Sequence, residues 1–177
     1  MFYTYKYDSP LGAITLASNG KALTGVWFDG QKNFGSTLPY EYQEKYLPVF
    51  GETTDWLNIY FSGKEPDFVP HLCLYVTPFQ KAVSEIMLSI PYGKTITYGE
   101  IANEIVTQTG AERMSARAVG SVVAHNAISI IVPCHRVVGA GGNLAGYAGG
   151  LERKIKLLEL EKADMSVLHM PQKYAGQ

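Results

Sequence analysis

The stretch ITYGEIANEIVTQTGAERMSARAVGSVVA, residues 96–124, contains the pattern from which the fold of the second half of the chain can be argued. Thr97 with Glu100 three residues later predicts a capping box, and the apolar residues after it recur with helical spacing. Ser115 can cap a second helix. Its buried stripe would consist of Ala118, Val119, Val122 and Val123. The intervening segment, residues 106–114, is longer than the usual tight turn, so a helix-turn-helix and two unrelated helices both fit this stretch alone.

The region upstream predicts one further helix and a small sheet. Thr77 can cap a helix with Pro78 in its first turn, and apolar residues recur every three or four positions until Pro91 ends the pattern. Residues 1–30 contain three short alternating runs, separated and followed by Asn-Gly and Asp-Gly turn signals. We expect these runs to form three antiparallel strands.

Between these two regions the pattern is mixed. The apolar residues of segment 56–61 have helical spacing and predict a helix that Thr54 or Asp55 opens. Residues 68–76 alternate like a strand, and Cys73 within them is expected to pack in the core.

Downstream of the quoted stretch, three segments follow one another. Residues 128–132 form an apolar, strand-like run, residues 139–150 a glycine-rich loop, and residues 151–162 an amphipathic helical pattern. Residues 165–177 show no clear periodicity, so we expect them to be loosely held.

A chain of 177 residues can form one large domain or two small ones. The change of pattern after residue 77 favours two, in an α/β (α+β) fold: a small N-terminal domain, residues 1–77, and a mainly helical C-terminal domain, residues 78–177. With 46% apolar and 18% charged residues the chain is not intrinsically disordered, and no apolar run reaches the roughly 18 residues that span a bilayer.

The cysteines and charges limit the class of protein further. Cys73 and Cys134 cannot build a disulfide framework, and neither belongs to a Cys-x-x-Cys metal motif. The N-terminus lacks the pattern of a signal peptide, so we expect an intracellular, cytoplasmic protein with free thiols. Residues 1–80 carry five basic and eight acidic side chains, whereas residues 81–177 carry ten and eight. The second part, with two more basic than acidic side chains, is the better partner for an anion. This excess of positive charge is small for a nucleic-acid-binding protein.

The sequence IIVPCHRVV, residues 130–138, places a thiol between a strand-like run and two basic side chains. Neighbouring cations and hydrogen-bond donors lower the pKa of a thiol from about 8.5 and so increase the fraction of nucleophilic thiolate. A lone cysteine is more often a small buried apolar residue. The polar run Cys134-His135-Arg136 favours a reactive thiol over that alternative.

This segment resembles the signature of the O6-alkylguanine-DNA alkyltransferases, also called methylated-DNA–protein-cysteine methyltransferases. Four further matches accompany it: ARAVG at 116–120, Asn126, GYAGGL at 146–151 and Glu161. The resemblance covers roughly residues 78–162. It implies a ribonuclease-H-like N-terminal domain and a C-terminal domain with a winged-helix-like helix-turn-helix.

The resemblance implies a single-use transfer of a methyl or other alkyl group from O6 of guanine, and from O4 of thymine, in DNA to Cys134. His135 would take the thiol proton through a water molecule, and Glu161 would orient the imidazole. Asn126 would link the helix to the active-site segment by hydrogen bonds. Tyr98 would donate to guanine N3, so that the base leaves as a neutral molecule.

The resemblance also implies how the protein reaches a base inside a duplex. In the family, the second helix of the helix-turn-helix enters the minor groove, and an arginine fills the gap that the flipped nucleotide leaves. Arg117 matches that arginine. Ser115, Ala116 and Ala118 would approach the DNA backbone closely, and Arg136 is assigned to DNA binding as well.

The pocket for the flipped base is implied to consist of Val137, Tyr147, Ala148 and Gly149, with carbonyls near Cys134 and Val137 accepting from the guanine amino group. Some members carry serine where this chain has Ala148. Some also hold zinc in the N-terminal domain, but residues 1–72 contain no cysteine and one histidine. We therefore expect no metal and no cofactor.

The expected partner is double-stranded DNA that carries O6-alkylguanine. We expect the protein to bind it as a monomer and to have no membrane partner. Two alternatives stay open. The first is a non-catalytic protein of the same fold that binds alkylated lesions, although such relatives lack the cysteine. The second is a cysteine hydrolase that uses Cys134 and His135, although neighbouring residues of a strand point to opposite faces.

Overall fold

The computed structural model describes residues 1–174, so the last three residues of the predicted second domain lie outside the described part. The chain folds into two compact units. Among the described residues, one comprises Met1–Tyr75 and Ala127–Ile131, and the other Val76–Asn126 and residues 132–174. The segment 127–131 belongs to the first unit because the N–H of Val26 donates to the carbonyl of Ala127, at 2.8 Å, and the carbonyl of Val26 accepts the N–H of Ser129. Within residues 1–174, none of the helices has the length and apolar character needed to cross a bilayer.

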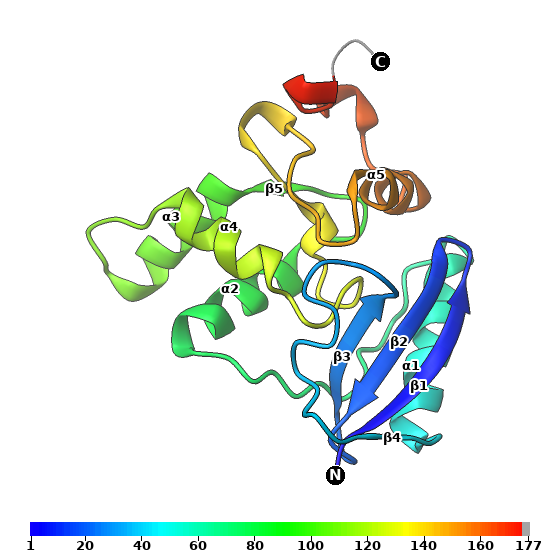
Figure 1. Cartoon of the computed structure of the whole chain (residues 1–177). Coiled ribbons are helices and arrows are strands. Elements are labelled where there is room, and N and C mark those ends of the chain that lie inside the picture. Colours follow the sequence, from blue (N-terminus) through cyan, green and yellow to red (C-terminus); the bar gives the residue numbers. More distant parts are fainter. Residues whose placement is uncertain (175–177) are drawn as a thin grey trace. The chain divides into compact units, whose positions relative to one another are not determined.

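The first unit is built on a four-stranded sheet (Figure 1). β1 (Tyr3–Ser9), β2 (Gly12–Ser18) and β3 (Leu23–Phe28) pair antiparallel in chain order, which confirms the predicted three strands. The short β4 (Gln43–Glu44) runs parallel to β1 and completes the order β3-β2-β1-β4. Every residue of β3 is buried, so this strand belongs to the core of the unit.

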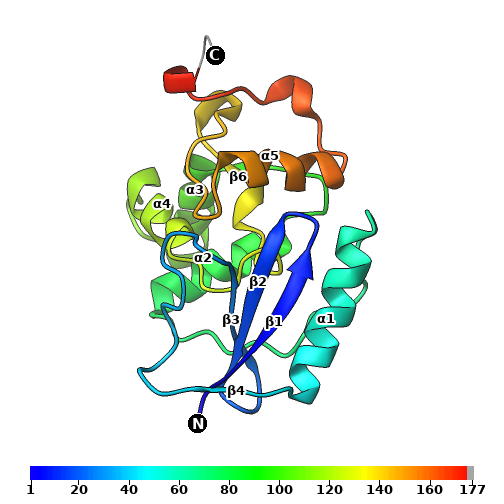
Figure 2. The same ribbon diagram turned by 45° about the vertical axis from the view of Figure 1, so that its right-hand side comes forward.

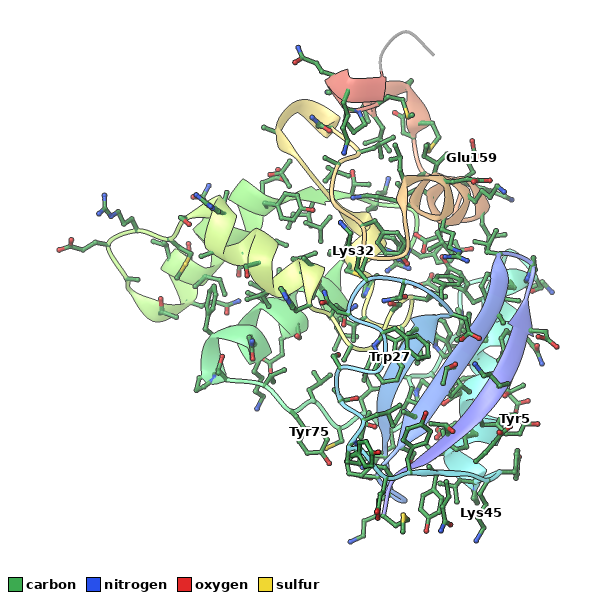
Figure 3. The ribbon with its side chains drawn as sticks, in the orientation of Figure 1. Tyr5, Trp27, Lys32, Lys45, Tyr75 and Glu159 are labelled. Atoms are coloured by element: carbon green, nitrogen blue, oxygen red, sulfur yellow. The ribbon has the colours of Figure 1, made fainter. Side chains whose placement is uncertain are left out.

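Helix α1 (Pro48–Phe61) lies alongside β1 (Figure 2). The ring of Tyr5, on β1 and labelled in Figure 3, stacks on Phe50 of α1 with ring centroids 5.9 Å apart. The Tyr7 hydroxyl donates to Asn58 Oδ1 at 2.8 Å. These aromatic contacts join the helix to the sheet.

The predicted start of this helix at Thr54 or Asp55 is wrong. The helix begins at Pro48, whose fixed φ suits the first turn and whose missing N–H costs no helical hydrogen bond there. Inside the helix, the Thr53 hydroxyl donates to the carbonyl of Val49, so hydroxyl residues in this segment mark no boundary.

The predicted strand over residues 68–76 is also wrong. Only one bridge forms, between Leu72 and Leu23 of β3, and Pro70 has no N–H with which to extend the pairing. Cys73 is half-buried and not in the core.

Three helices form most of the second unit: α2 (Pro78–Ser89), α3 (Tyr98–Thr109) and α4 (Ala116–Ala124). The predicted caps are confirmed, because Thr77 and Thr97 form capping boxes with Gln80 and Glu100, and Ser115 accepts from the N–H of Ala118. α3 continues to Thr109, so the connection to α4 is shorter than the predicted segment 106–114. The two helices therefore form the expected helix-turn-helix (Figure 1).

The strand-like interpretation of the segment before Cys134 is wrong. Ile130 has φ 70°, in the left-handed region that β-branched residues rarely adopt, and this ends any extended run. Cys134–Arg136 then forms a turn of 3-10 helix, and the only strand here is the two-residue β6 (Val137–Val138), parallel to β5 (Ile96–Thr97).

Helix α5 (Leu151–Leu160) matches the predicted helix except for its last two residues. The expectation that the following segment is loosely held is wrong for residues 165–169. His169 donates its N–H to the carbonyl of Gly142 and accepts from the N–H of Leu144, at 3.0 and 2.9 Å. Met165 and Leu168 pack against the apolar cluster formed by Val138, Leu144, Leu158 and Ala163. Residues 175–177 of the segment lie outside the described part.

Candidate active site around Cys134

Cys134 opens the 3-10 turn directly after Pro133, and only 3% of the residue is exposed. Asn126, two residues beyond α4, donates from Nδ2 to both Cys134 Sγ (3.1 Å) and the carbonyl oxygen of Val132 (2.8 Å). The structure therefore brings the predicted amide to the predicted thiol. Asn126 connects the end of the helix-turn-helix to the reactive position.

The resting thiol of Cys134 is protonated at neutral pH. Burial raises its pKa above the ordinary value, and the hydrogen bond from Asn126 and the charge of Lys154 oppose this rise only in part. The expectation of a low-pKa thiol is therefore wrong for the resting protein, because the loss of hydration outweighs the polar neighbours. A base has to take the proton before the sulfur can attack.

His135 is fully buried and has the geometry of such a base. Its Nε2 lies 2.6 Å from Glu161 Oε1. Burial lowers the pKa of His135, and the interactions with Glu161 oppose this without reversing it, so the ring is neutral. A neutral ring that donates its Nε2–H to the carboxylate has its basic lone pair on Nδ1.

Glu161 directly follows α5, as its C-cap, and is held as a carboxylate. Arg136 donates from Nε to Oε2 (2.9 Å) and from Nη2 to Oε1 (3.0 Å), and the N–H of Gly93 donates to Oε2 (3.1 Å). Burial alone raises the pKa of Glu161, but its hydrogen bonds and charge contacts with His135 and Arg136 outweigh burial and lower it to about 2. The charged carboxylate fixes the imidazole in one orientation.

The predicted DNA-binding role of Arg136 does not fit the structure. Its guanidinium is buried, forms two bonds with Glu161 and donates from Nη1 to the carbonyl of Ile90 at 2.8 Å. A side chain committed in this way cannot reach a phosphate without leaving the carboxylate unpaired. Arg136 instead neutralises and orients Glu161.

Tyr98, the first residue of α3, faces the loop that follows β6. Its hydroxyl donates to the carbonyl of Gly146 at 3.2 Å, with Ala145 at 3.5 Å. Burial, with a smaller effect of the nearby Cys134, raises the pKa of Tyr98 to about 12. The hydroxyl therefore keeps its proton at neutral pH and can donate it in a hydrogen bond.

Two of the predicted pocket residues, Val137 and Tyr147, lie beside the same turn. Val137 is fully buried, and Tyr147 lies edge-on to the His135 ring with centroids 6.4 Å apart. Gly149 is buried and Ala148 half-buried, and the carbonyl of Gly149 accepts from Arg153. The backbone of segment 145–149 thus lies between Tyr98 and the start of α5.

Lys154 is the residue that the sequence interpretation missed. It is completely buried on α5, and its Nζ donates to the carbonyl of Val137 at 2.6 Å and to that of Ala145 at 3.2 Å. A signal was present, because Lys154 follows Leu151 by three residues and precedes Leu158 by four, on the apolar stripe of the helix.

The residues predicted to contact DNA lie at the start of α4. Ala116 and Arg117 are exposed, and Ala118 is half-buried. The Ser115 hydroxyl accepts from the N–H of Ala118 at 2.9 Å, so it caps the helix. The first turn of α4 therefore presents an exposed guanidinium beside small side chains.

Two family models match the chain. One is described as the DNA binding domain of 6-O-methylguanine DNA methyltransferase and matches residues 78–163, and the other as its ribonuclease-like domain and matches residues 1–71. Among curated proteins, a methylated-DNA–protein-cysteine methyltransferase of Mycobacterium tuberculosis is 45% identical over 163 residues, which cover 92% of this chain and 94% of that protein. One of Methanosarcina acetivorans is 41% identical over 162 residues, with 91% and 98% covered.

Solved structures of proteins from the same family resemble this chain. The crystal structure of Mycobacterium tuberculosis OGT in complex with DNA has a TM-score of 0.78 and 43% identity, and the match covers 94% of each chain. The O6-methylguanine-DNA methyltransferase of Pyrococcus kodakaraensis has a TM-score of 0.59 and 25% identity, with 91% of this chain and 99% of that chain covered. The similarity thus extends over both units.

Proposed function

This chain belongs to the methylated-DNA–protein-cysteine methyltransferase family, and from that membership we propose how its residues remove an alkyl group from DNA. The protein repairs DNA by direct reversal: it transfers an alkyl group from O6 of guanine to a cysteine of its own. Cys134 is the acceptor in this proposal. Its burial beside a neutral histidine and an amide donor supports the assignment.

The chemical step is an in-line displacement. The Cys134 thiolate attacks the alkyl carbon, the S–C bond forms, and the C–O6 bond breaks with its electron pair passing to the base. The product is an S-alkylcysteine, which water does not readily hydrolyse, and therefore each molecule acts once.

His135 and Glu161 generate the thiolate in this proposal. The proton of the Cys134 thiol passes, through a water molecule, to Nδ1 of His135. The resulting imidazolium lies against the Glu161 carboxylate at 2.6 Å. The ionised Glu161 stabilises that charge, as the third member of a nucleophile–base–orienter set.

Asn126 and Tyr98 complete the site. The Asn126 amide donates to Sγ and so favours the developing thiolate. The Tyr98 hydroxyl, protonated at neutral pH, would exchange its bond to the Gly146 carbonyl for one to guanine N3. A donor there allows the base to leave without a full negative charge.

The helix-turn-helix delivers the lesion to this site. We assign α4 to the minor groove, with Arg117 occupying the space of the flipped nucleotide and the small residues Ala116 and Ala118 allowing close approach. We also propose domain boundaries at residues 1–77 and 78–177, with residues 127–131 returning to pack in the first domain. We further propose that the protein acts inside the cell, in the compartment that holds its DNA substrate.

The observation that carries the proposal is the set of buried Cys134, His135 and Glu161 with the half-buried Asn126 bonded to the sulfur. The test is to incubate the protein with a duplex that holds one O6-methylguanine and to measure its intact mass, with Cys134→Ser in parallel. We expect a gain of one CH2 unit per molecule that stops at one equivalent and is absent in the variant. Binding to the lesion without a mass change would identify a recognition protein and overturn the proposal. A duplex with O4-methylthymine tests the second lesion.

A further inference from the structure

Glu161 occupies an unfavourable place for a carboxylate. It directly follows the last turn of α5, where the free carbonyls give the end of a helix a partial negative charge that repels an anion. The side chain is nevertheless buried, and its Oε1 lies 2.6 Å from Nε2 of His135. Groups outside α5 therefore have to hold the carboxylate in this position.

One of these groups is a backbone N–H in the turn of residues 90–94, which connects α2 to β5. Gly93 donates this N–H to Glu161 Oε2 at 3.1 Å. The turn is closed by the N–H of Lys94, which donates to the carbonyl of Pro91 at 3.0 Å. A donor that belongs to the backbone of a closed turn has little freedom to move, so it fixes the direction of the carboxylate.

The direction of this N–H depends on the type of turn. The φ of Gly93 is 74° and that of Tyr92 is negative, which is the pattern of a type II turn. A residue with a side chain at position 93 favours a type I turn instead. The two types differ by roughly 150° in ψ at the second residue and by roughly 170° in φ at the third, so the peptide between these residues is turned over and its N–H points to the opposite side. Glycine at position 93 therefore directs the donor toward Glu161.

A close contact restricts the same position. A Cβ added to Gly93 would lie 2.7 Å from the backbone carbonyl oxygen of Glu161, so one of the two residues would have to shift. Gly30 has a similar φ, 81°, but no atom within 4 Å of an added Cβ. A substitution at Gly30 thus introduces the same backbone strain without the contact.

The turn of residues 90–94 also holds Arg136, the guanidinium partner of the carboxylate. Arg136 binds both oxygens of Glu161 and donates from Nη1 to the carbonyl of Ile90 at 2.8 Å. Its Cζ lies 5.6 Å from the centroid of the Tyr92 ring, within the range at which an aromatic face attracts a cation. The guanidinium therefore has two anchors in the turn that also binds the carboxylate.

We propose that the turn of residues 90–94 is a positioning element for alkyl transfer. The Gly93 N–H and the Tyr92 ring fix the Glu161 carboxylate, directly and through its guanidinium partner. The carboxylate then orients the His135 ring. This inference rests on the proposed function, in which His135 is the base, but the arrangement exists before DNA binds and can be tested in the free protein.

The first experiment observes the His135 ring by NMR in the free protein, with isotopically labelled histidine. The proton on Nε2, bound to Glu161 across 2.6 Å, should give a strongly downfield signal that is absent in His135→Gln. Gly93→Ala should move this signal upfield or lose it to exchange with water. Gly30→Ala is the matched control and should leave it unchanged. An unchanged signal in folded Gly93→Ala would overturn the inference.

The second experiment measures the single-turnover rate of alkyl transfer from a saturating O6-methylguanine duplex. Gly93→Ala should slow transfer at least tenfold, because a displacement of about 1 Å in a positioned group can cost on the order of a hundredfold. Gly30→Ala should react at the rate of the parent. If Gly93→Ala lowers the urea midpoint but transfers at the parent rate, the turn serves stability alone and the inference fails.

A pair of variants at Tyr92 covers the case in which Gly93→Ala does not fold. Tyr92→Phe keeps the ring beside the guanidinium and should keep the parent rate and the His135 signal. Tyr92→Leu removes the ring and should slow transfer about two- to fivefold, the effect of losing one cation–π contact, and move the His135 signal. Equal rates in the two variants would then overturn the inference.

The two experiments separate this inference from the proposed function. If the parent transfers no alkyl group, but the His135 signal still moves in Gly93→Ala and not in Gly30→Ala, the proposed function fails. The positioning of the imidazole by the turn of residues 90–94 then stands.

Discussion

At the scale of single residues, the carboxylate of Glu161 has three hydrogen-bond partners. His135, Arg136 and the N–H of Gly93 all bind it, and it is buried. Replacing it removes the orienting group for the imidazole and at the same time leaves a guanidinium without its anion.

We expect Glu161→Gln to lower the free energy of unfolding by roughly 3–5 kcal/mol, because one member of a buried pair is removed. It should also slow alkyl transfer, because the imidazolium loses its stabilising charge. Urea denaturation and single-turnover rates measure the two effects. Glu159→Gln on the same helix, at the exposed position labelled in Figure 3, is the control and should change neither. Normal stability in Glu161→Gln would show that Arg136 finds another partner.

The same residues predict how stability depends on pH. The pKa of Glu161 is lower in the folded state, about 2, than in the unfolded chain, so its contribution is complete above the unfolded value and is lost as the pH falls toward 2. Burial also lowers the pKa of His135, so the unfolded chain binds a proton more readily below about pH 6.5. Both effects act in one direction. The urea midpoint should fall from pH 7 to about pH 4 mainly through His135, and further below about pH 4 through Glu161. A midpoint that does not change in the first range would contradict the assignment of His135, and one that does not fall in the second would contradict that of Glu161.

At the scale of elements, α4 carries the proposed contact with the flipped nucleotide. Arg117→Ala should slow repair of a duplex much more than repair of the same lesion in a single strand, because only the duplex needs the vacated space filled. Single-turnover rates on the two substrates give the ratio. Lys81→Ala, an exposed cation on α2, is the control for loss of charge. An equal loss on both substrates would assign Arg117 to general phosphate binding.

The loop between Val137 and Ala145, whose carbonyls Lys154 binds, is also held by the segment after α5. Gly142 has φ 90°, and a Cβ added there would collide with the carbonyl oxygen of Val167, whereas Gly141 has φ 68° and no contact closer than 4.0 Å. Gly141→Ala should cost about 1–2 kcal/mol for the left-handed backbone alone, and Gly142→Ala clearly more. Thermal unfolding measures both. Equal losses would show that residues 165–169 move away at little cost.

At the scale of the whole molecule, the small net charge of −1 predicts weakly salt-dependent DNA binding. If α4 and the helix N-termini supply most contacts and few lysines do, the slope of log affinity against log salt should have a magnitude of about 2 to 4. Titrations of a lesion duplex at several salt concentrations give this slope. A magnitude near 8 would require a basic surface that the composition does not suggest.

The local signals in the sequence were sufficient for the caps and periodic helices. Thr77, Thr97 and Ser115 act within one turn of the backbone, so their consequences could be predicted without tertiary information. The prediction of a strand over residues 68–76 was wrong because a strand needs a neighbouring strand to pair with, and only Leu72 forms such a bridge. The predicted start of α1 was wrong because Thr54 or Asp55 was taken as the N-terminal boundary, whereas the helix begins at Pro48.

In the candidate site, too, short motifs predicted some features, and others depend on tertiary contacts. The motif around Cys134 predicted which side chains meet, and the structure brings Asn126 to the sulfur and Glu161 to His135. The pKa of the thiol and the partners of Arg136 depend on burial, which no short motif encodes. The burial of Lys154 was not predicted because a lysine on a helix is usually exposed to solvent. Only its position on the apolar stripe of α5 distinguishes it.

The return of residues 127–131 to the first unit has a consequence for engineering. A gene cut near residue 76 would not give two self-contained cassettes, because the front piece would lose the segment that bonds to Val26, and the rear piece would keep buried residues such as Ile128 without their strand neighbour. Chimaeras between relatives should therefore exchange residues 127–131 together with residues 1–75. A swap at the linear boundary alone would combine a sheet from one parent with its closing segment from the other.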